Sequence, residues 1–409
     1  MKTQNEERVE RHRISCNSEY YNMLCEFCKS ATRLYNHANY IVRQEFINNH
    51  IWLRYNDLDR ILKLDKAYPD YYNTPVVQAS QQILRILDKN WKSFFNSIKD
   101  WKKHPEKYLG RPKLPNYKSK DSLSTLILTN QNCKSTGDKI IFPKSFNGFC
   151  ITTKIRNKQN FNTLQQVRLV PEYKSIIVEI VYSVKAVEPI SNDRYIGIDI
   201  GLNNLATVCN NFGKDAFIIN GKPIKSINHY YNKKSAHYDK IYDRNNHIKT
   251  SNRKNKLSED RKAKIDDYLH KASRYIINYC LDNNVSTIII GKNNGWKQNI
   301  NIGKVTNQNF VQIPFNRLID MIQYKAKDSG ITVILTEESY TSGTSFIDNE
   351  EPIKENYNKN RRIYRGLFRS NNGILINADL NAAYQIIKKA VPIKWDIGCV
   401  LHPFVVNIT

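Results

Sequence analysis

Apolar residues near the N-terminus recur at helical spacing. Between residues 20 and 41 they fall every three or four positions, and a second stripe runs from 76 to 101. These stripes predict two long helices that each bury one face. Core packing is the simplest role for the stripes, whereas the basic end "SFFNSIKDWKKHPEKY" is a candidate contact for a phosphate backbone. The apolar positions are Tyr20, Leu24, Phe27, Ala31, Leu34, Ala38 and Ile41, then Ile83, Leu87, Trp91, Phe94 and Ile98.

The apolar period changes to two after the break "LGRPKLPNYKSKD", which is rich in Pro, Gly and Lys. Short apolar segments follow closely on one another: "KIIFPKSF", "FCITTKI", "QQVRLV" and "SIIVEIVYSVK". Strands in such close succession predict a small antiparallel sheet or barrel.

Strands and helices alternate in the C-terminal half of the chain. The strand "YIGIDIG" is followed by the hairpin partners "LATVCN" and "AFIIN", and then by basic helical segments around 230–279. Further on come "VSTIIIG", a helix beginning near Pro314, "ITVILTE", and the helix "ADLNAAYQIIKKA". This order predicts a mixed α/β sheet, and we expect the chemistry of the protein there.

The chain is long and strongly basic. Its 409 residues indicate two or three domains, and 63 Lys and Arg against 38 Asp and Glu give a formal charge of +25. An excess of this size favours a polyanionic partner, nucleic acid first. The alternative is the codon bias of an A/T-rich genome, which enriches Lys, Asn, Ile and Tyr.

Neither a secretory signal nor a membrane span is apparent, so we expect an intracellular protein without a membrane partner. The eight cysteines are scattered, and the one close pair, Cys25 and Cys28, falls within a helical pattern. Buried thiols are therefore favoured over a zinc site, which needs four ligands.

Asp199 is the first candidate catalytic acid. Strand alternation in "YIGIDIG" puts it on the face opposite Ile196 and Ile198, where a carboxylate needs a cation or a strong donor. A turn-forming Asp before Gly201 is the structural alternative. An actin-like or sugar-kinase phosphate loop is the functional alternative, although no later glycine-rich loop supports it.

Asp379 is the second candidate and falls at a predicted helix start. On that helix it shares a face with Ala383 and Ile387, so its carboxylate lies on the buried stripe, where the helix N-terminus stabilises negative charge. Ordinary N-capping by Asp379 or Asn377 is the alternative.

The third candidate is one of two adjacent acids, Glu337 and Glu338, at the end of "ITVILTE". Consecutive strand residues point to opposite faces, so only one of them can share the side of Asp199. A solvated loop acid is the alternative. Together, three carboxylates from two strand ends and a helix start suit Mg²⁺, with two ions expected, and favour phosphodiester hydrolysis.

Four segments resemble the RuvC-type nuclease domain of TnpB, an RNA-guided endonuclease family of bacterial insertion sequences. They are "IGIDIGLNNLATV", "YTSGTSFIDNE", "RRIYRGLFRSNNG" and "INADLNAAYQI", in the order of the family. TnpB is similar to compact type V CRISPR effectors and to the eukaryotic Fanzor proteins. The resemblance covers residues 194–390 most strongly, and it places the first and last catalytic Asp on Asp199 and Asp379.

The resemblance implies a multidomain α/β protein: an RNase H-like (RuvC) mixed sheet with helices, an N-terminal helical recognition lobe and a small β-barrel wedge domain. The wedge would begin in 1–18 and continue as a barrel in 113–190. The lobe would occupy 19–112 and the nuclease domain 191–392, with a C-terminal tail at 393–409. The implied partners are a transposon-encoded guide RNA and double-stranded target DNA beside a short adjacent motif. We expect a monomer in the RNA complex, located in the bacterial cytoplasm at the nucleoid, or in the nucleus for a eukaryotic relative.

The chain departs from the family pattern at two places. Most TnpB proteins carry a catalytic Glu where this chain has Gly291 and Lys292. A sub-branch has that Glu on the next strand, and Glu338 matches the relocated position, with Glu337 as the lower-ranked alternative. Many relatives also carry a zinc finger before the last Asp, but 342–377 contains no cysteine, so no zinc is expected.

Several further residues are candidate nucleic-acid contacts. The basic string in 361–369 would contact phosphate, with a solvated charge run as the alternative. The segment 249–264 and the 296–297 loop would meet guide or DNA, with Trp296 either stacking on a base or packing in the fold. The candidates are Gln78, Gln81, Arg253, Lys254, Lys256, Trp296, Lys297, Arg361, Arg362, Arg365 and Arg369.

These observations favour an RNA-guided DNA endonuclease in which base pairing supplies sequence specificity. A nuclease-inactive, RNA-guided DNA-binding repressor is the first alternative, because relatives can lose the acids and keep targeting. An actin-like ATPase is the second.

Overall fold

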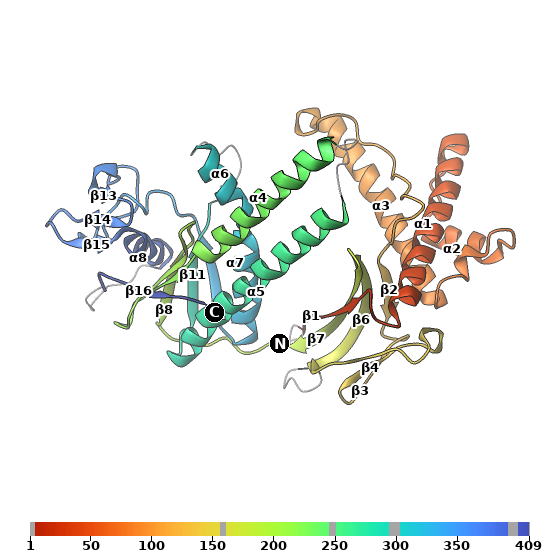
Figure 1. The fold of residues 1–409 in the computed structure, drawn as a ribbon, viewed down its shortest axis with the longest axis horizontal. Helices are drawn as coiled ribbons and strands as arrows, with labels where there is room; N and C mark the ends of the chain where they lie inside the picture. Colours follow the sequence, from red (N-terminus) through yellow and green to blue (C-terminus); the bar gives the residue numbers. More distant parts are fainter. Residues whose placement is uncertain (1–4, 156–160, 245–250, 294–302, 392–399, 409) are drawn as a thin grey trace. The chain divides into compact units, whose positions relative to one another are not determined.

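The computed structural model describes residues 5–155, 161–244, 251–293, 303–391 and 400–408 (Figure 1). The chain forms two compact units, Met1–Ala186 and Val187–Thr409. Among the described residues, no helix combines the length and the apolar character that crossing a bilayer requires.

The first unit contains three helices, of which the first and the third follow the two predicted apolar stripes. They are α1 (Tyr21–Asn49), α2 (Tyr55–Leu64) and α3 (Val77–Lys103). Leu24 and Leu34 on α1, and Leu87 and Trp91 on α3, are fully buried, as the spacing predicts. Helix α1 continues beyond the predicted end at residue 41 until His50, whose φ of 57° lies in the left-handed region and stops the helix. Short 3₁₀ turns flank these helices at η1 (Pro69–Tyr71) and η2 (Pro105–Lys107).

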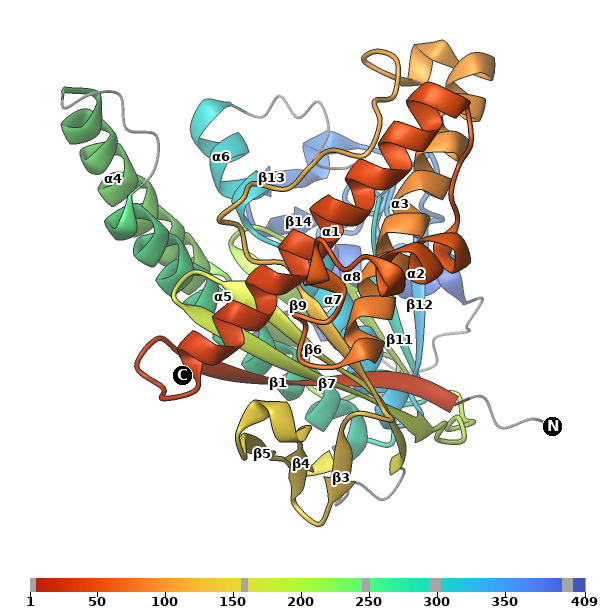
Figure 2. The ribbon, with the colours of Figure 1, turned by 90° about the vertical axis from the view of Figure 1, so that its right-hand side faces the viewer.

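The strands of the first unit form two antiparallel sheets (Figure 2). The larger has the order β1-β7-β6-β2 and the smaller β3-β4-β5. Strand β1 lacks a clear apolar pattern because it alternates Glu and Arg, yet it pairs with β7 along its whole length. Closure into a barrel stays a prediction. The strands are β1 (Asn5–Ser15), β2 (Leu126–Thr129), β3 (Lys134–Thr136), β4 (Lys139–Ile141), β5 (Cys150–Thr152), β6 (Phe161–Glu172) and β7 (Ser175–Lys185), with the turn η3 (Lys144–Phe146) before β5.

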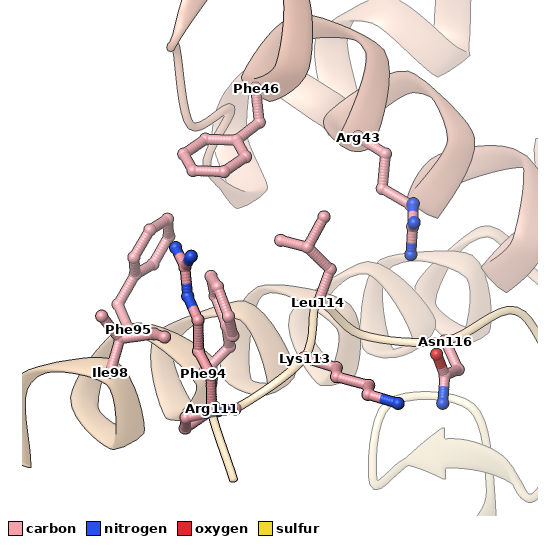
Figure 3. A pocket seen from close by; sticks show the side chains of 10 residues that line it. Arg43, Phe46, Phe94, Phe95, Ile98, Arg111, Lys113, Leu114 and Asn116 are labelled. Carbon is pink, nitrogen blue, oxygen red and sulfur yellow. The ribbon is translucent and has the colours of Figure 1, made fainter. Parts of the chain in front are cut away.

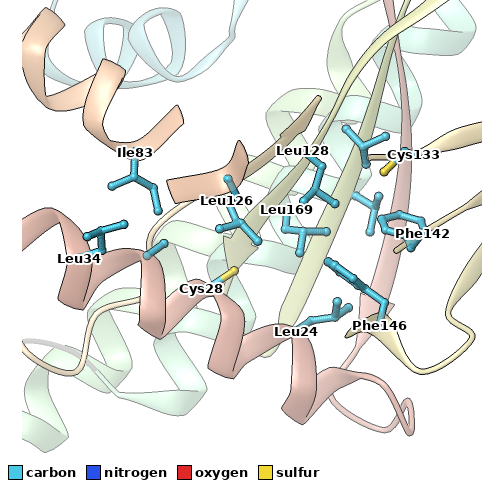
Figure 4. Close-up of a cluster of buried hydrophobic side chains, with 14 of the residues drawn as sticks. Leu24, Cys28, Leu34, Ile83, Leu126, Leu128, Cys133, Phe142, Phe146 and Leu169 are labelled. Carbon is cyan, nitrogen blue, oxygen red and sulfur yellow. The ribbon is translucent and has the colours of Figure 1, made fainter. Parts of the chain in front are cut away.

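The core of the first unit lies between the helices and the sheets. Figure 4 shows Leu24 and Cys28 of α1 facing Leu126 and Leu169 of the larger sheet. Burial raises the pKa of the Cys28 thiol to about 12, which keeps it a protonated, inert thiol. The structure therefore agrees with a buried thiol at Cys28.

The second unit contains the predicted mixed sheet, with the order β12-β11-β8-β9-β10-β16. Strands β8, β11 and β12 are parallel, whereas β8, β9 and β10 form antiparallel hairpins. The predicted tail at 393–409 is wrong in one respect: β16 pairs in parallel with β10 and extends the sheet. The strands are β8 (Tyr195–Asp199), β9 (Asn204–Asn210), β10 (Phe217–Asn220), β11 (Thr287–Gly291), β12 (Thr332–Thr336) and β16 (Phe404–Val406).

Helices cover both faces of this sheet. Ile198 and Ile288 share a core with α5 and α7, whereas Ile289 packs in a separate core with α8. Residues that alternate along a strand thus feed opposite faces, as predicted for β8. Helices α4 and α5 lie side by side (Figure 1). The helices are α4 (Lys222–Arg244), α5 (Asn252–Asp282), α6 (Lys304–Gln312), α7 (Phe315–Asp328) and α8 (Ala378–Ala390).

The segment between β12 and α8 contains a small antiparallel sheet with the order β13-β14-β15. Its strands are β13 (Arg362–Tyr364), β14 (Leu367–Arg369) and β15 (Leu375–Asn377), preceded by the turn η5 (Lys359–Arg361). The basic string predicted as a loop therefore lies largely on two paired strands. Strands β13 and β14 show no alternation of apolar and polar residues in the sequence, because polar residues occur on both faces.

Candidate active site

The three predicted acids lie at one edge of the six-stranded sheet. Asp199 ends β8, Glu338 follows the end of β12, and Asp379 lies in the first turn of α8. Strands β8 and β12 both run parallel to β11, so their carboxyl ends meet at the same edge. All three acids line one cavity of about 490 Å³. The remaining lining residues are Asn293, Ser339, Tyr340, Thr341, Ser342, Tyr357, Arg362 and Ala382.

The surroundings of Asp199 strongly disfavour its charged form. Its pKa is raised well above the usual range, first by burial and then by the negative charges of Asp379 and Glu338, while Arg362 acts in the opposite direction. Carboxylates that repel one another in this way create a demand for a proton or a cation.

Asp379 is free of the capping role that was its structural alternative. Asn377 is the N-cap of α8, and its Oδ1 accepts from the backbone N–H of Asp379 at 3.1 Å and of Leu380 at 3.0 Å. The carboxylate of Asp379 instead accepts from Asn204 Nδ2 at 2.7 Å and pairs with Arg362 Nη2 at 3.0 Å. Both bonds hold it toward the cavity.

The two adjacent glutamates have opposite surroundings. Glu338 lines the cavity and is clamped by Asn293, whose Nδ2 donates to Glu338 Oε1 at 3.1 Å and whose Oδ1 accepts from Glu338 N at 3.0 Å. Burial, and then the charge of Glu337, raise the pKa of Glu338 to about 7. The Glu337 side chain is 54% exposed and pairs with Lys389 Nζ at 2.5 Å. Glu338 is therefore the inward acid of the pair.

Gly291 ends β11, the strand on which the resemblance to TnpB would place the third acid. A Cβ at this position would lie 2.5 Å from Ile386 Cδ1 and 3.1 Å from Glu338 Oε2. The first distance is shorter than any real Cβ contact. Helix α8 and the Glu338 carboxylate thus fill the space that a side chain at residue 291 would need.

The donor set matches a hard divalent cation in its chemistry, because all three acids offer carboxylate oxygens. As the side chains stand, however, the described part of the chain contains no group of three or more His, Cys, Asp or Glu residues arranged to hold a metal ion. Arg362 and Asn204 engage Asp379, and Asn293 engages Glu338. Metal binding would compete with the Arg362 ion pair, whereas the amide hydrogen bonds can persist because each carboxylate oxygen has a second lone pair.

The predicted basic string divides into structural and exposed residues. Arg361 pairs with both carboxylate oxygens of Glu350, which favours a structural role for it. Arg362 faces the acid cavity, and Arg365 and Arg369 are exposed. The last three remain candidate phosphate contacts.

The other predicted contacts are scattered over both units. Arg253 and Lys256 are exposed on α5, whereas Lys254 is ion-paired with Asp239. Gln78 accepts from Asn132 Nδ2 at 3.1 Å, and Gln81 is half-buried on α3. Trp296 and Lys297 lie outside the described residues.

The sequence prediction named the segment 93–108 as a candidate phosphate contact, but it did not predict the groove that Phe94 and Phe95 of this segment form with Phe46, Arg111 and Lys113. Figure 3 shows Arg111 reaching toward the rings of Phe94 and Phe95, with Phe46 on the facing helix. The cavity measures about 500 Å³, and Lys113 also lines it. The adjacent aromatic pair before a Lys- and Arg-rich break was the available signal. The prediction also missed Asn204 and Asn293, because no spacing rule singles out an amide that orients a carboxylate.

Two family models each match a part of the chain. OrfB_IS605, described as a probable transposase, matches residues 178–297, and the Cas12f1-like TNB domain matches residues 315–386. A curated relative, the CRISPR-associated endodeoxyribonuclease Cas12f2 of Micrarchaeota archaeon (strain CG1_02_47_40), is 28% identical over 209 residues. That match covers 48% of this chain and 37% of the relative.

A solved structure is similar to the chain as a whole. The protein of the Cas12f1-sgRNA-target DNA complex, solved by cryo-EM, aligns with a TM-score of 0.55 at 14% identity. The alignment covers 90% of this chain and 82% of that chain, and it supports the multidomain α/β fold. The two family models and the curated relative confirm the resemblance to TnpB and the compact type V effectors.

Proposed function

We propose that this chain, which resembles TnpB and the compact type V effectors, is an RNA-guided DNA endonuclease that hydrolyses phosphodiester bonds with Mg²⁺. A transposon-encoded guide RNA would pair with double-stranded target DNA beside a short adjacent motif. The observation that carries the proposal is the meeting of Asp199, Glu338 and Asp379 in one cavity. The cleavage pattern and the adjacent motif are left to experiment.

In the proposed mechanism, Asp199, Glu338 and Asp379 hold Mg²⁺. When bound, the metal supplies an activated water and neutralises charge on the phosphate. Asn293 and Asn204 orient Glu338 and Asp379 through the bonds described above. Arg362, already within reach of Asp379 at 3.0 Å, would exchange that carboxylate for a phosphate oxygen when nucleic acid enters.

The charge distribution supports a nucleic-acid partner. The formal charge is +25. The exposed Arg369 lies on the same small sheet as Arg362, and the exposed Arg365 lies in the turn between β13 and β14. The groove of the first unit, lined by Phe94, Phe95 and Arg111, combines the side chains that bind unpaired nucleotides.

The test begins with the RNA that co-purifies with the full-length chain. Its sequence should identify a guide, and a DNA target that matches this guide should be cut in Mg²⁺ and left intact in EDTA. Asp199→Asn should abolish cutting while RNA-directed DNA binding persists. Binding without cutting in the wild type would favour the repressor, and stabilisation by ATP without nucleic acid would favour the actin-like ATPase.

A further inference from the structure

Two tyrosines stand on the wall of the acid cavity. Tyr340 follows Glu338 by two positions, and Tyr357 comes from the chain that leads to β13. Both line the cavity together with the three acids and Arg362. Their ring centroids lie 5.8 Å apart at an interplanar angle of 71°, which is an edge-to-face pair. The carboxylates therefore have an aromatic pair as their neighbour.

The backbone of Tyr340 is held in an unfavourable conformation. Its φ of 69° lies in the left-handed region, which costs free energy for a bulky side chain. Its carbonyl accepts from Thr344 Oγ1 at 3.0 Å and from Gly343 N at 3.4 Å, which fixes the turn. The result is an aromatic residue that remains 39% exposed. Burial of this ring in the core does not explain the strained backbone.

The Tyr357 ring is fixed by a glycine. A Cβ at Gly343 would lie 2.4 Å from Tyr357 Cε2, so only glycine permits the ring to pack there. The backbone N–H of Asn358 donates to the carbonyl of Gly343 at 3.0 Å and ties the two segments together. Tyr357 is thus a rigid support against which the exposed Tyr340 ring is held.

We propose that Tyr340, supported by Tyr357, stacks on an unpaired base of single-stranded DNA next to the phosphate that the acids cut. This inference rests on the proposed nuclease function and adds to it a residue that positions the nucleotide. Arg362 gives the cavity a cation for the phosphate, and Tyr340 gives it a ring for the base. Together they match one nucleotide.

The proposal requires an unpaired strand. A base within a duplex is stacked on both faces, so a side chain reaches its face only after the base leaves the stack. A ring beside the acids therefore favours displaced or unwound DNA over intact duplex.

The experiment measures stacking apart from cutting. Full-length protein carrying Asp199→Asn, in EDTA, is titrated into single-stranded DNA oligonucleotides that carry a fluorescent purine analogue at successive positions. The Asp199→Asn protein that keeps Tyr340 should quench the fluorescence of the analogue at one or a few positions. Tyr340→Leu should remove that quenching and weaken binding about tenfold, because stacking on one base contributes at this scale. Tyr340→Phe, the matched control, keeps the ring and should behave as the tyrosine does.

Two further arms make the result decisive. Tyr357→Leu should reduce the quenching by loosening the support, and thermal unfolding of each variant checks that the fold survives. Duplex DNA of the same sequence should show a smaller dependence on the ring. Equal quenching and affinity in Tyr340 and Tyr340→Leu proteins would overturn the proposal, as would an equal effect on duplex.

Failure of the stacking and failure of the nuclease proposal give different results. If wild-type protein cuts matched DNA and the ring has no effect on quenching, the stacking inference alone is wrong. If quenching follows the ring but Asp199→Asn leaves cutting unchanged, the stacking stands and the catalytic assignment is wrong.

Discussion

Gly291 lies in the sheet directly beside the strand whose end carries Glu338. It pairs with Thr336 in the parallel register of β11 and β12, two residues before that acid. A catalytic side chain at 291 and one at 338 would compete for the same space, since the Glu338 carboxylate already lies 3.1 Å from a Cβ at 291. The steric fit therefore supports relocation of the acid to the neighbouring strand.

The variant Gly291→Ala tests this fit. We expect lower thermal stability and weaker Mg²⁺-induced stabilisation, because the added methyl group collides with Ile386 Cδ1 at 2.5 Å and crowds Glu338. Differential scanning fluorimetry with and without Mg²⁺ measures both effects. Gly110→Ala, where a Cβ meets open space, is the matched control. Adding Ile386→Val, which removes Cδ1 at a smaller packing cost, should recover part of the loss. Unchanged stability and unchanged Mg²⁺ response in Gly291→Ala would contradict the crowding argument.

Lys325 is a buried cation outside the acid cavity. It is 4% exposed, and its Nζ donates to the carbonyl of His270 at 2.8 Å and to Ser273 Oγ at 2.6 Å. Burial, and then the charge of Arg274, lower the pKa of Lys325 to about 8 from the ordinary 10.5. The charged form of Lys325 is thus less favoured in the folded protein than in the unfolded chain.

The pH dependence of unfolding follows from this shift. Between pH 8 and 10.5 the unfolded chain binds more protons at Lys325 than the folded chain, so this residue makes stability rise with pH across that window. The gain is at most about 3 kcal/mol. In urea unfolding, the Lys325→Met variant should lack this rise of the free energy of unfolding with pH. Lys327 is exposed, so the Lys327→Met variant should keep the rise. Parallel pH profiles for wild type and Lys325→Met would contradict the assignment.

At the scale of elements, the segment between β12 and α8 is held together by Glu350. Its carboxylate accepts from Arg361 Nη2 at 2.7 Å, from Asn371 Nδ2 at 3.1 Å and from the backbone N–H of Ser345 at 2.9 Å. Its backbone carbonyl accepts from Gln385 Nε2 on α8 at 3.1 Å. This network joins both ends of the segment to the helix that carries Asp379.

Arg361→Ala should therefore loosen the segment. We expect a loss of about 2 kcal/mol and faster limited proteolysis within 342–377, because a half-buried carboxylate loses its charged donors. Arg365→Ala, which removes an exposed arginine from the turn between β13 and β14, is the matched control and should leave proteolysis unchanged. Equal rates of proteolysis in the two variants would argue against this stabilising role of the Glu350 network.

The sequence predicted the elements whose apolar period was long or regular. Helices α1 and α3 and the alternation of β8 followed directly from spacing. Strand β16 was missed because three apolar residues near the terminus carry no period, and its pairing with β10 is long-range. Strands β13 and β14 were not predicted, because their basic residues made the segment resemble a polar loop. For the site, alternation separated Glu337 from Glu338, but the clamp by Asn293 depends on tertiary contacts.

At the scale of the whole molecule, the positive net charge favours nucleic acid as a partner. A chain with a formal charge of +25 gains by neutralising phosphates, and counterion release makes such binding steeply dependent on salt. The exposed cations of both units, including Arg111, Arg253 and Arg365, are expected to share this role.

A salt titration tests the contribution of individual cations. RNA binding to the full-length chain should weaken steeply as salt rises, and Arg111→Ala should reduce the slope of log affinity against log salt by about 1. Filter binding at several salt concentrations measures the slope. Lys29→Ala is the matched control, because Glu26 already neutralises that ammonium group. A slope insensitive to Arg111 would remove the groove from the RNA interface.

The central claim is that Glu338 supplies the acid missing at Gly291. Side-by-side cleavage of guide-matched DNA in Mg²⁺ by Glu338→Gln and Glu337→Gln complexes tests it most directly. The account predicts loss of cutting by a hundredfold or more, on the order of 3 kcal/mol, in Glu338→Gln alone, with RNA binding and folding retained in both. Full cutting by Glu338→Gln, or loss in Glu337→Gln instead, would contradict it.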